Sequence, residues 1–220
     1  MTRGWLTVGM TITTPQASEP QPLFIKICGL RTPDMVEQCV ALEVDAIGFV
    51  FAESSVRYVD AVVVRELGAG IPSSVEGVGV FLDAPVDEVT STLERAGLGT
   101  AQLHGDYSAD ELAVIEKRGF QVITALSVSR FLSGGAAGRR VLIDGDNPGS
   151  GAEFPAGLLQ GRDLPADWIL AGGLTPANVA RRVRELAPSG VDVSSGVESS
   201  RGVKSAGLIR EFVAEARRWP

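Results

Sequence analysis

The chain is poor in the residues from which metal and disulfide sites are built. Its 220 residues include two cysteines and one histidine, and Cys28 and Cys39 fall on different predicted elements without the spacing of zinc ligands. We therefore expect no metal site and two reduced thiols.

Positive charge and long apolar runs are also scarce. The formal net charge of -7 argues against nucleic acid as the main partner, because duplex binding usually needs a basic face. No apolar run approaches a membrane span, and residues 5–10 are too short and threonine-rich for a secretory signal. We expect no nucleic-acid or membrane partner and a cytoplasmic location. A phosphate site is still compatible with this charge, since backbone amides can bind anions.

What is present fits one globular domain. Hydrophobic residues make up 45% and charged residues 21% of the chain, an ordinary balance for a globular protein. Residues 1–22 end in TTPQASEPQP and show no periodicity, so we predict a flexible N-terminal extension, with Met10 as an alternative start. Residues 23–220 then form the domain.

From Phe24 onward, short apolar runs alternate with helical patterns. The runs are continuous, as in parallel strands covered on both faces. Eight strands are predicted, with roughly eight helical crossovers; the strands are 24–28, 45–51, 75–82, 101–105, 121–126, 140–143, 167–171 and 191–193. The weakly patterned stretch 127–138 predicts a short or irregular helix, a glycine-rich loop at 145–151 precedes a poor helix near 155–160, and a helix is predicted at 176–186. The pattern predicts an α/β protein with a closed (β/α)₈ TIM barrel. A doubly wound open sheet is the alternative, and the absence of G-x-G-x-x-G after the first strand disfavours dinucleotide binding.

The stretch FIKICGL places a cysteine where a strand ends. Cys28 is followed by Gly29, and a helix-patterned run begins after Thr32-Pro33. In parallel α/β proteins the loops after the strands carry the chemistry, so Cys28 is a candidate functional thiol. The alternative is a small buried hydrophobe, which is what we expect of Cys39 because it lies on the apolar face of the next helix.

In a barrel, the other strand ends would open onto the same mouth as Cys28. Gly172-Gly173 follows the seventh strand and Ser194-Ser195-Gly196 follows the eighth, where barrels commonly bind phosphate through backbone amides. Each motif alone is also an ordinary turn. Their positions together predict a phosphate site.

Cys28 and Asp144 form a candidate acid–base pair. A thiolate and a carboxylic acid can move a proton between carbon and oxygen if each pKa is tuned toward the working pH. Lys26 or loop amides would lower the cysteine pKa, and partial burial would keep Asp144 protonated. The alternative for Asp144 is a loop-capping role in DGDN.

Nine sequence blocks resemble the phosphoribosylanthranilate isomerase family. They occur in the family's order between about Phe24 and Phe212: KICGL, DAIGFVF, SVRYV, VGVF, QLHGD, LID, GSG, LAGGLTPANV and VDVSSGVE. The resemblance implies an Amadori rearrangement of N-(5-phosphoribosyl)anthranilate in tryptophan biosynthesis, without cofactor or metal.

The resemblance also implies residue roles. Cys28 would be the general base and Asp144 the general acid. Arg57 would contact the substrate, with its guanidinium suited to the anthranilate carboxylate, while His104 and Asp192 would line the pocket. The glycine and serine runs would grip the phosphate.

Two departures from the family pattern stand out. Phe154 is followed by Pro155 and Ala156 instead of an aspartate-tryptophan pair, and Tyr107 replaces a common acidic residue. For His104 the alternative is a hydrogen bond to the backbone, and for Arg57 a solvated loop charge.

Three other functions remain open at this point. The related sugar-phosphate isomerase of histidine biosynthesis, or a dual-substrate form, uses two aspartates, so a cysteine ending the first strand speaks against it. A non-catalytic phosphosugar-binding barrel and a scaffold are further alternatives. The sequence leaves monomer and homodimer equally open.

Overall fold

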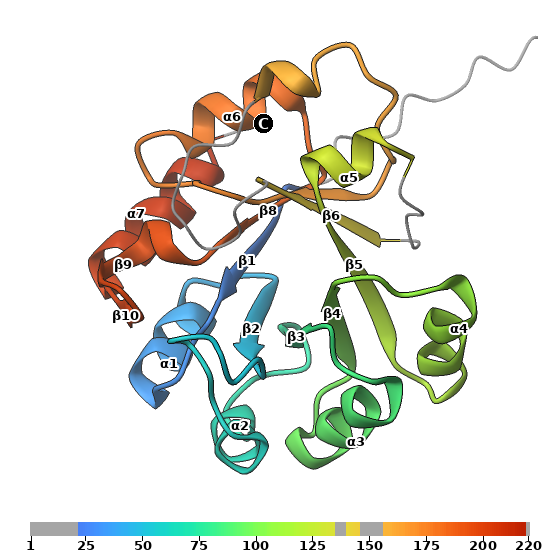
Figure 1. Cartoon of the computed structure of the whole chain (residues 1–220). Helices are drawn as coiled ribbons and strands as arrows, with labels where there is room; N and C mark the ends of the chain where they lie inside the picture. Colours follow the sequence, from blue (N-terminus) through green and yellow to red (C-terminus); the bar gives the residue numbers. More distant parts are fainter. Residues whose placement is uncertain (1–21, 135–139, 146–155, 219–220) are drawn as a thin grey trace, which may run out of the picture.

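The computed structural model describes residues 22–134, 140–145 and 156–218. Eight parallel strands close into a barrel in chain order, with β1 hydrogen-bonded to β8 (Figure 1). The strands are β1 (Phe24–Cys28), β2 (Ala46–Val50), β3 (Glu76–Leu82), β4 (Thr100–His104), β5 (Gln121–Ser127), β6 (Arg140–Asp144), β7 (Trp168–Leu170) and β8 (Gly190–Val193). The predicted barrel is confirmed, and the open sheet is excluded.

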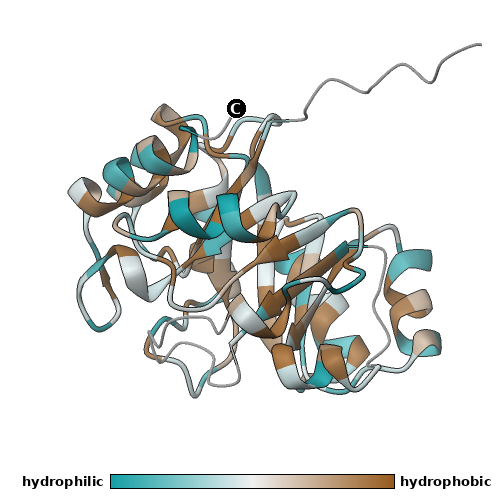
Figure 2. Ribbon diagram, turned by 90° about the horizontal axis from the view of Figure 1, so that it is seen from above, coloured by the Kyte–Doolittle hydropathy of each residue, from teal (hydrophilic) through white to brown (hydrophobic). Residues whose placement is uncertain are grey.

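The strands are buried on both faces, which explains their continuous apolar composition. One cluster of side chains packs between the strands and the helices, and a smaller one fills the barrel interior with Ala46, Val78, Ile123, Ala125, Leu142, Ile169 and Ala171. Figure 2 shows the corresponding hydropathy pattern, with apolar strands at the centre and hydrophilic residues on the helices.

Helices follow the strands and surround them. They are α1 (Pro33–Ala41), α2 (Ala61–Gly68), α3 (Val86–Ala96), α4 (Ala109–Lys117), α5 (Val128–Leu132), α6 (Val179–Leu186) and α7 (Ala206–Ala216). Local signals begin several of them: Asp60 accepts a hydrogen bond from the Val62 amide, and Ser108 forms a capping box with Glu111. The weak pattern after β5 does yield a short helix, as predicted.

The poor helix predicted near residues 155–160 forms only a single helical turn. In the described part of the β6–β7 connection the only helical element is a 3₁₀ turn, η1 (Ala156–Leu158). Gly157 and Gly161 weaken this segment as a helix. A short antiparallel hairpin after β8, formed by β9 (Glu198–Ser200) and β10 (Val203–Lys204), was not predicted.

The sixth helix also begins later than its sequence pattern indicates. Its predicted start is Pro176, but α6 begins at Val179. The Asn178 side chain accepts a hydrogen bond from the Thr175 amide and donates one to the Gly173 carbonyl. These bonds hold residues 175–178 as a turn that anchors the loop after β7.

Parts of the sequence-based predictions lie outside the described residues. They are residues 1–21 of the N-terminal extension, residues 146–151 of the glycine-rich loop, and Phe154 and Pro155, where the sequence departs from the family pattern, so their conformations stay predictions. Among the described helices, none has the length and apolar character needed to span a membrane.

Candidate active site

The candidate acid–base residues lie at one rim of the barrel. Cys28 is the last residue of β1, His104 of β4 and Asp144 of β6. Ser194 directly follows β8. Because all eight strands are parallel, these chain-distant positions share the mouth formed by the carboxyl ends of the strands.

Glycines make room for these side chains. A Cβ atom on Gly48 would lie 2.9 Å from the Cys28 sulfur and 3.1 Å from Lys26 Nζ. At Gly172, whose φ is +88°, a Cβ atom would lie 2.5 Å from Asp144 Oδ1. Two glycines therefore permit the thiol and the carboxyl to occupy their positions.

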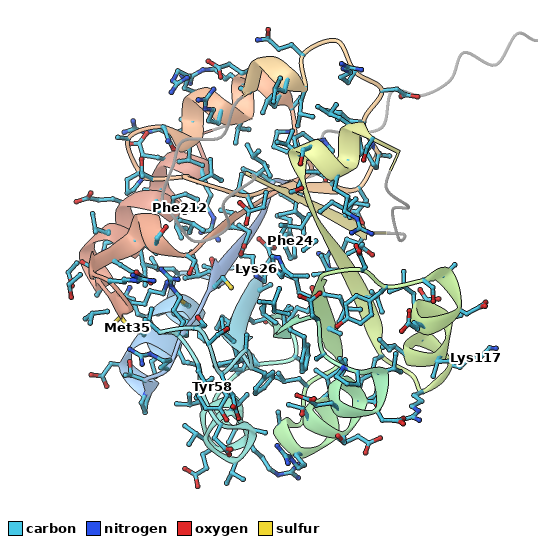
Figure 3. The ribbon with its side chains drawn as sticks, viewed as in Figure 1. Phe24, Lys26, Met35, Tyr58, Lys117 and Phe212 are labelled. Atoms are coloured by element: carbon cyan, nitrogen blue, oxygen red, sulfur yellow. The ribbon has the colours of Figure 1, made fainter. Side chains whose placement is uncertain are left out.

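A buried ion pair lies beneath the mouth. Lys26 Nζ lies 2.8 Å from Asp192 Oδ1, and the Lys26 side chain is fully buried. Figure 3 shows Lys26 on β1 inside the ring of strands. Burial acts to lower the Lys26 pKa, but Asp192 outweighs it and the pKa is raised. Lys26 is therefore a fixed cation inside the barrel.

The Cys28 thiol is protonated at neutral pH. Burial raises its pKa, and the nearby Lys26 and Lys204 ammoniums offset this only in part. The predicted influence of Lys26 is present, but it does not produce a lowered pKa. The residue is 6% exposed.

Asp144 has the pKa expected of a general acid. Burial, assisted by the negative charge of Asp192, raises the Asp144 pKa to about 6. The Gly145 amide donates to Asp144 Oδ1 at 2.7 Å and opposes this shift. The same hydrogen bond is the loop-capping contact expected under the alternative for Asp144. The carboxyl therefore caps the loop and also has a pKa suited to a general acid.

His104 is a neutral imidazole near pH 7. Burial and the Lys26 charge lower its pKa to about 4. The Gln102 amide nitrogen lies 2.8 Å from His104 Nε2. The roles of the two groups in this contact depend on the tautomer of the ring. The contact is with a side chain, not with the backbone as in the alternative.

Arg57 belongs to a charged cluster with Glu198 and Lys204. Its Nε and Nη2 atoms bind the two Glu198 carboxylate oxygens at 2.7 and 2.9 Å. Lys204 Nζ contacts Glu198 Oε1 at 3.0 Å and the Ser194 carbonyl at 2.8 Å. Arg57 is thus held by an ion pair instead of being a solvated loop charge.

The two candidate phosphate loops touch each other. A Cβ atom on Gly196 would lie 1.8 Å from the Leu174 carbonyl oxygen, so only glycine permits this approach. Gly172 and Gly173 both have positive φ values, and Ser195 and Gly196 belong to the 3₁₀ turn η2 (Ser195–Val197). The loops after β7 and β8 therefore present their backbones side by side.

Tyr107 ties together two loops of the mouth. Its hydroxyl donates to the Ala84 carbonyl at 2.7 Å, which joins the loop after β4 to the loop after β3. This contact gives a structural account of the tyrosine that replaces the common acidic residue.

Sequence reasoning missed Gln102, Glu198 and Lys204. Gln102 and Glu198 lie inside the blocks QLHGD and VDVSSGVE, so their positions were available. Their partners were not, because Arg57 and Glu198 are 141 residues apart in the chain.

The mouth of the closed parallel barrel carries a thiol, a carboxyl of raised pKa and two adjoining glycine loops. This arrangement fits an enzyme that moves protons on a phosphorylated substrate. Comparisons with known proteins specify this class further. A family model described as N-(5'phosphoribosyl)anthranilate (PRA) isomerase matches residues 25–215. The chain belongs to this family, which confirms the resemblance identified in the sequence.

Individual relatives agree with the family model. The N-(5'-phosphoribosyl)anthranilate isomerase of Rhodospirillum rubrum is 39% identical over 212 residues, covering 88% of this chain and 97% of the relative. That of Oceanobacillus iheyensis is 33% identical, with 89% and 98% covered.

Solved structures show the same likeness. TrpF from Jonesia denitrificans has a TM-score of 0.78 and 38% identity, covering 89% of this chain and 97% of that one. A phosphoribosyl anthranilate isomerase in complex with reduced 1-(o-carboxyphenylamino)-1-deoxyribulose 5-phosphate has a TM-score of 0.78 and 30% identity, covering 89% and 99%.

Proposed function

We propose that this protein catalyses the Amadori rearrangement of N-(5-phosphoribosyl)anthranilate to 1-(2-carboxyphenylamino)-1-deoxyribulose 5-phosphate, a step of tryptophan biosynthesis. Family membership supports the reaction class. The single structural observation that carries the proposal is the Asp144 carboxyl, which has a pKa raised to about 6 and shares the mouth with Cys28.

Asp144 is the general acid of the first step. Its carboxyl donates a proton to the furanose ring oxygen as the bond from that oxygen to the anomeric carbon breaks. The electron pair of the bond goes to the oxygen, and the anthranilate nitrogen supplies a lone pair to form an iminium. Burial keeps the carboxyl protonated enough to act in this way.

Cys28 is the general base of the second step. As a thiolate it removes the proton from C2, and the released electron pair forms the enol-amine and neutralises the iminium nitrogen. Because burial raises the Cys28 pKa above its usual value, the thiolate is the minor form in the free enzyme. Lys26 and Lys204 are the cations that favour it.

The remaining mouth residues bind and orient the substrate. The adjoining loops with Gly172, Gly173, Ser194, Ser195 and Gly196 hold the phosphate through backbone amides. Arg57 binds the anthranilate carboxylate. His104 and Asp192 line the pocket, and Asp192 pairs with Lys26.

The test is a fluorescence assay with freshly made phosphoribosylanthranilate, in which anthranilate fluorescence falls on turnover. We expect turnover by the native protein and none above background by Cys28→Ser. The histidine-pathway aminoaldose is assayed in parallel. Turnover of both substrates would show a dual enzyme, and turnover of neither, with a product analogue still bound, would show a non-catalytic binding barrel.

Several properties stay predictions beside this reaction. They are the absence of a cofactor or metal requirement, a cytoplasmic location, and a monomeric or homodimeric state. Among solved relatives, monomers have been generated from the dimeric phosphoribosylanthranilate isomerase of Thermotoga maritima.

A further inference from the structure

The hairpin β9–β10 contacts the loop that carries Arg57. Glu198, the first residue of β9, binds Arg57 through both carboxylate oxygens. Gly202, in the turn, donates its amide to Glu198 Oε2 at 2.9 Å, and its carbonyl accepts a bond from Arg31 at 2.6 Å. The hairpin therefore joins the loops after β1, β2 and β8.

The cluster is nearly closed to solvent. The side chains of Arg57, Glu198 and Lys204 are 11%, 4% and 3% exposed. Arg57, Lys204 and the Gly202 amide lower the Glu198 pKa to about 2 against the opposing effect of burial. Glu198 is thus a permanent anion between two cations, and the three groups together keep a net positive charge.

Glu198 occupies one edge of the Arg57 guanidinium and leaves another available. Its contacts use Nε and Nη2 along the side of the fork. The described residues form no hydrogen bond to Nη1, so the end of the fork can receive a second carboxylate. A guanidinium binds carboxylates best in this paired, planar geometry.

The cluster also connects to the candidate base. Lys204 Nζ contacts the Ser194 carbonyl and hydroxyl, and Ser194 Oγ donates to the Cys28 carbonyl at 3.1 Å. Beside it, a Cβ atom on Gly29 would lie 2.8 Å from Arg57 Cδ. The Arg57 side chain is therefore packed against the loop that follows Cys28.

We propose that Glu198 is a positioning residue that orients Arg57 to bind the substrate carboxylate and so determines selectivity for a carboxylated aryl group. The inference rests on the proposed function and adds a residue to its binding site. Without the Glu198 anion, the guanidinium loses both bonds that hold its plane, and its end is no longer presented to the substrate.

The test compares two ligands and two variants by calorimetry. The ligands are reduced 1-(o-carboxyphenylamino)-1-deoxyribulose 5-phosphate and the same compound without its carboxyl group. We expect Glu198→Gln to weaken binding of the carboxylated ligand about tenfold, the effect of losing a charged hydrogen bond. Binding of the decarboxylated ligand should change by less than about twofold.

Glu76→Gln is the matched control, because Glu76 pairs with Arg140 away from the mouth, and it should leave both affinities unchanged. Glu198→Asp keeps the charge on a shorter side chain, so its affinity for the carboxylated ligand should lie between those of the native protein and Glu198→Gln. This second variant keeps the test decisive if Glu198→Gln does not fold. In steady-state kinetics Glu198→Gln should raise KM for phosphoribosylanthranilate more than it lowers kcat.

Equal weakening of both ligands by Glu198→Gln, or no weakening of either, would overturn the positioning role. Additive effects of Glu198→Gln and Arg57→Lys on binding of the carboxylated ligand would do the same, since residues that act through one another are non-additive. The proposed function fails separately, if the native protein does not turn over phosphoribosylanthranilate.

Discussion

Polar groups at the two ends of the barrel differ in how they are paired, and this difference separates a structural role from the proposed chemical one. At the amino-terminal end of the strands, Glu76 binds Thr100 Oγ1 at 2.6 Å and Arg140 Nη1 at 2.7 Å. The Arg140 guanidinium also lies 4.2 Å from the centre of the Phe24 ring. Both Glu76 oxygens therefore have partners.

At the opposite end, Lys26 pairs with Asp192 and Arg57 with Glu198. The candidate acid–base side chains differ from these, because Cys28, His104 and Asp144 form no ion pair among the described residues. Asp144 has a backbone amide as its bonding partner among the described residues, and it lies in the field of Lys26 and Asp192. The pKa values of Cys28, His104 and Asp144 are all shifted there. A buried group without an opposite charge keeps its proton equilibrium adjustable, whereas a paired one is fixed.

The largest expected difference between substitutions at the two ends of the barrel is in turnover. Cys28→Ser and Asp144→Asn should each lower kcat by about 10²- to 10⁴-fold with little change in ligand binding, because each removes a proposed proton-transfer group. Cys39→Ser, which changes a buried thiol outside the mouth, is the control and should keep kcat. Near-native turnover in either mouth variant would break the assignment.

The next effect is a pH-dependent difference in stability. The folded Asp144 pKa is raised from 3.8 to about 6, so folding favours the protonated carboxyl. This stabilisation is present below the unfolded pKa and is lost as pH rises through 6. Between pH 3 and pH 7 the native protein should lose about 3 kcal/mol of unfolding free energy relative to Asp144→Asn. Urea denaturation of both proteins across this pH range measures the difference in unfolding free energy. If the unfolding free energies of the two proteins change in parallel with pH, the Asp144 pKa is not raised.

A change at the amino-terminal end should affect stability and leave kcat intact. Glu76→Gln removes the charge that pairs with Arg140, whose side chain is 20% exposed. We expect a loss of about 1–3 kcal/mol in unfolding free energy, measured by urea denaturation, with unchanged turnover. A fall in kcat at a temperature where the variant is folded would show that the two clusters are coupled.

The smallest effect is expected at the phosphate loops. Since the proposed phosphate grip is made by backbone amides, Ser195→Ala should weaken binding of the reduced product analogue only about two- to fivefold, the loss of one hydrogen bond. Calorimetry measures it. Complete loss of binding would show that the Ser195 hydroxyl, not the main chain, is the principal ligand.

The sequence by itself determined the barrel, because eight continuous apolar runs separated by helical patterns leave few closed arrangements. It also placed Cys28, Asp144, His104 and the glycine loops at strand ends, since a strand boundary is a local signal. The 3₁₀ turn after β6 and the hairpin after β8 lacked comparably strong local patterns.

Tertiary structure alone decided which charges meet. Arg57 pairs with Glu198, and Lys26 pairs with Asp192 across the barrel closure. It also decided the direction of each pKa shift, including the raised pKa of Cys28, where burial outweighs the lowering by Lys26 that the sequence suggested. The physical reason is that desolvation and Coulomb energy depend on burial and distance in space, and parallel strands bring together residues that are far apart in the chain.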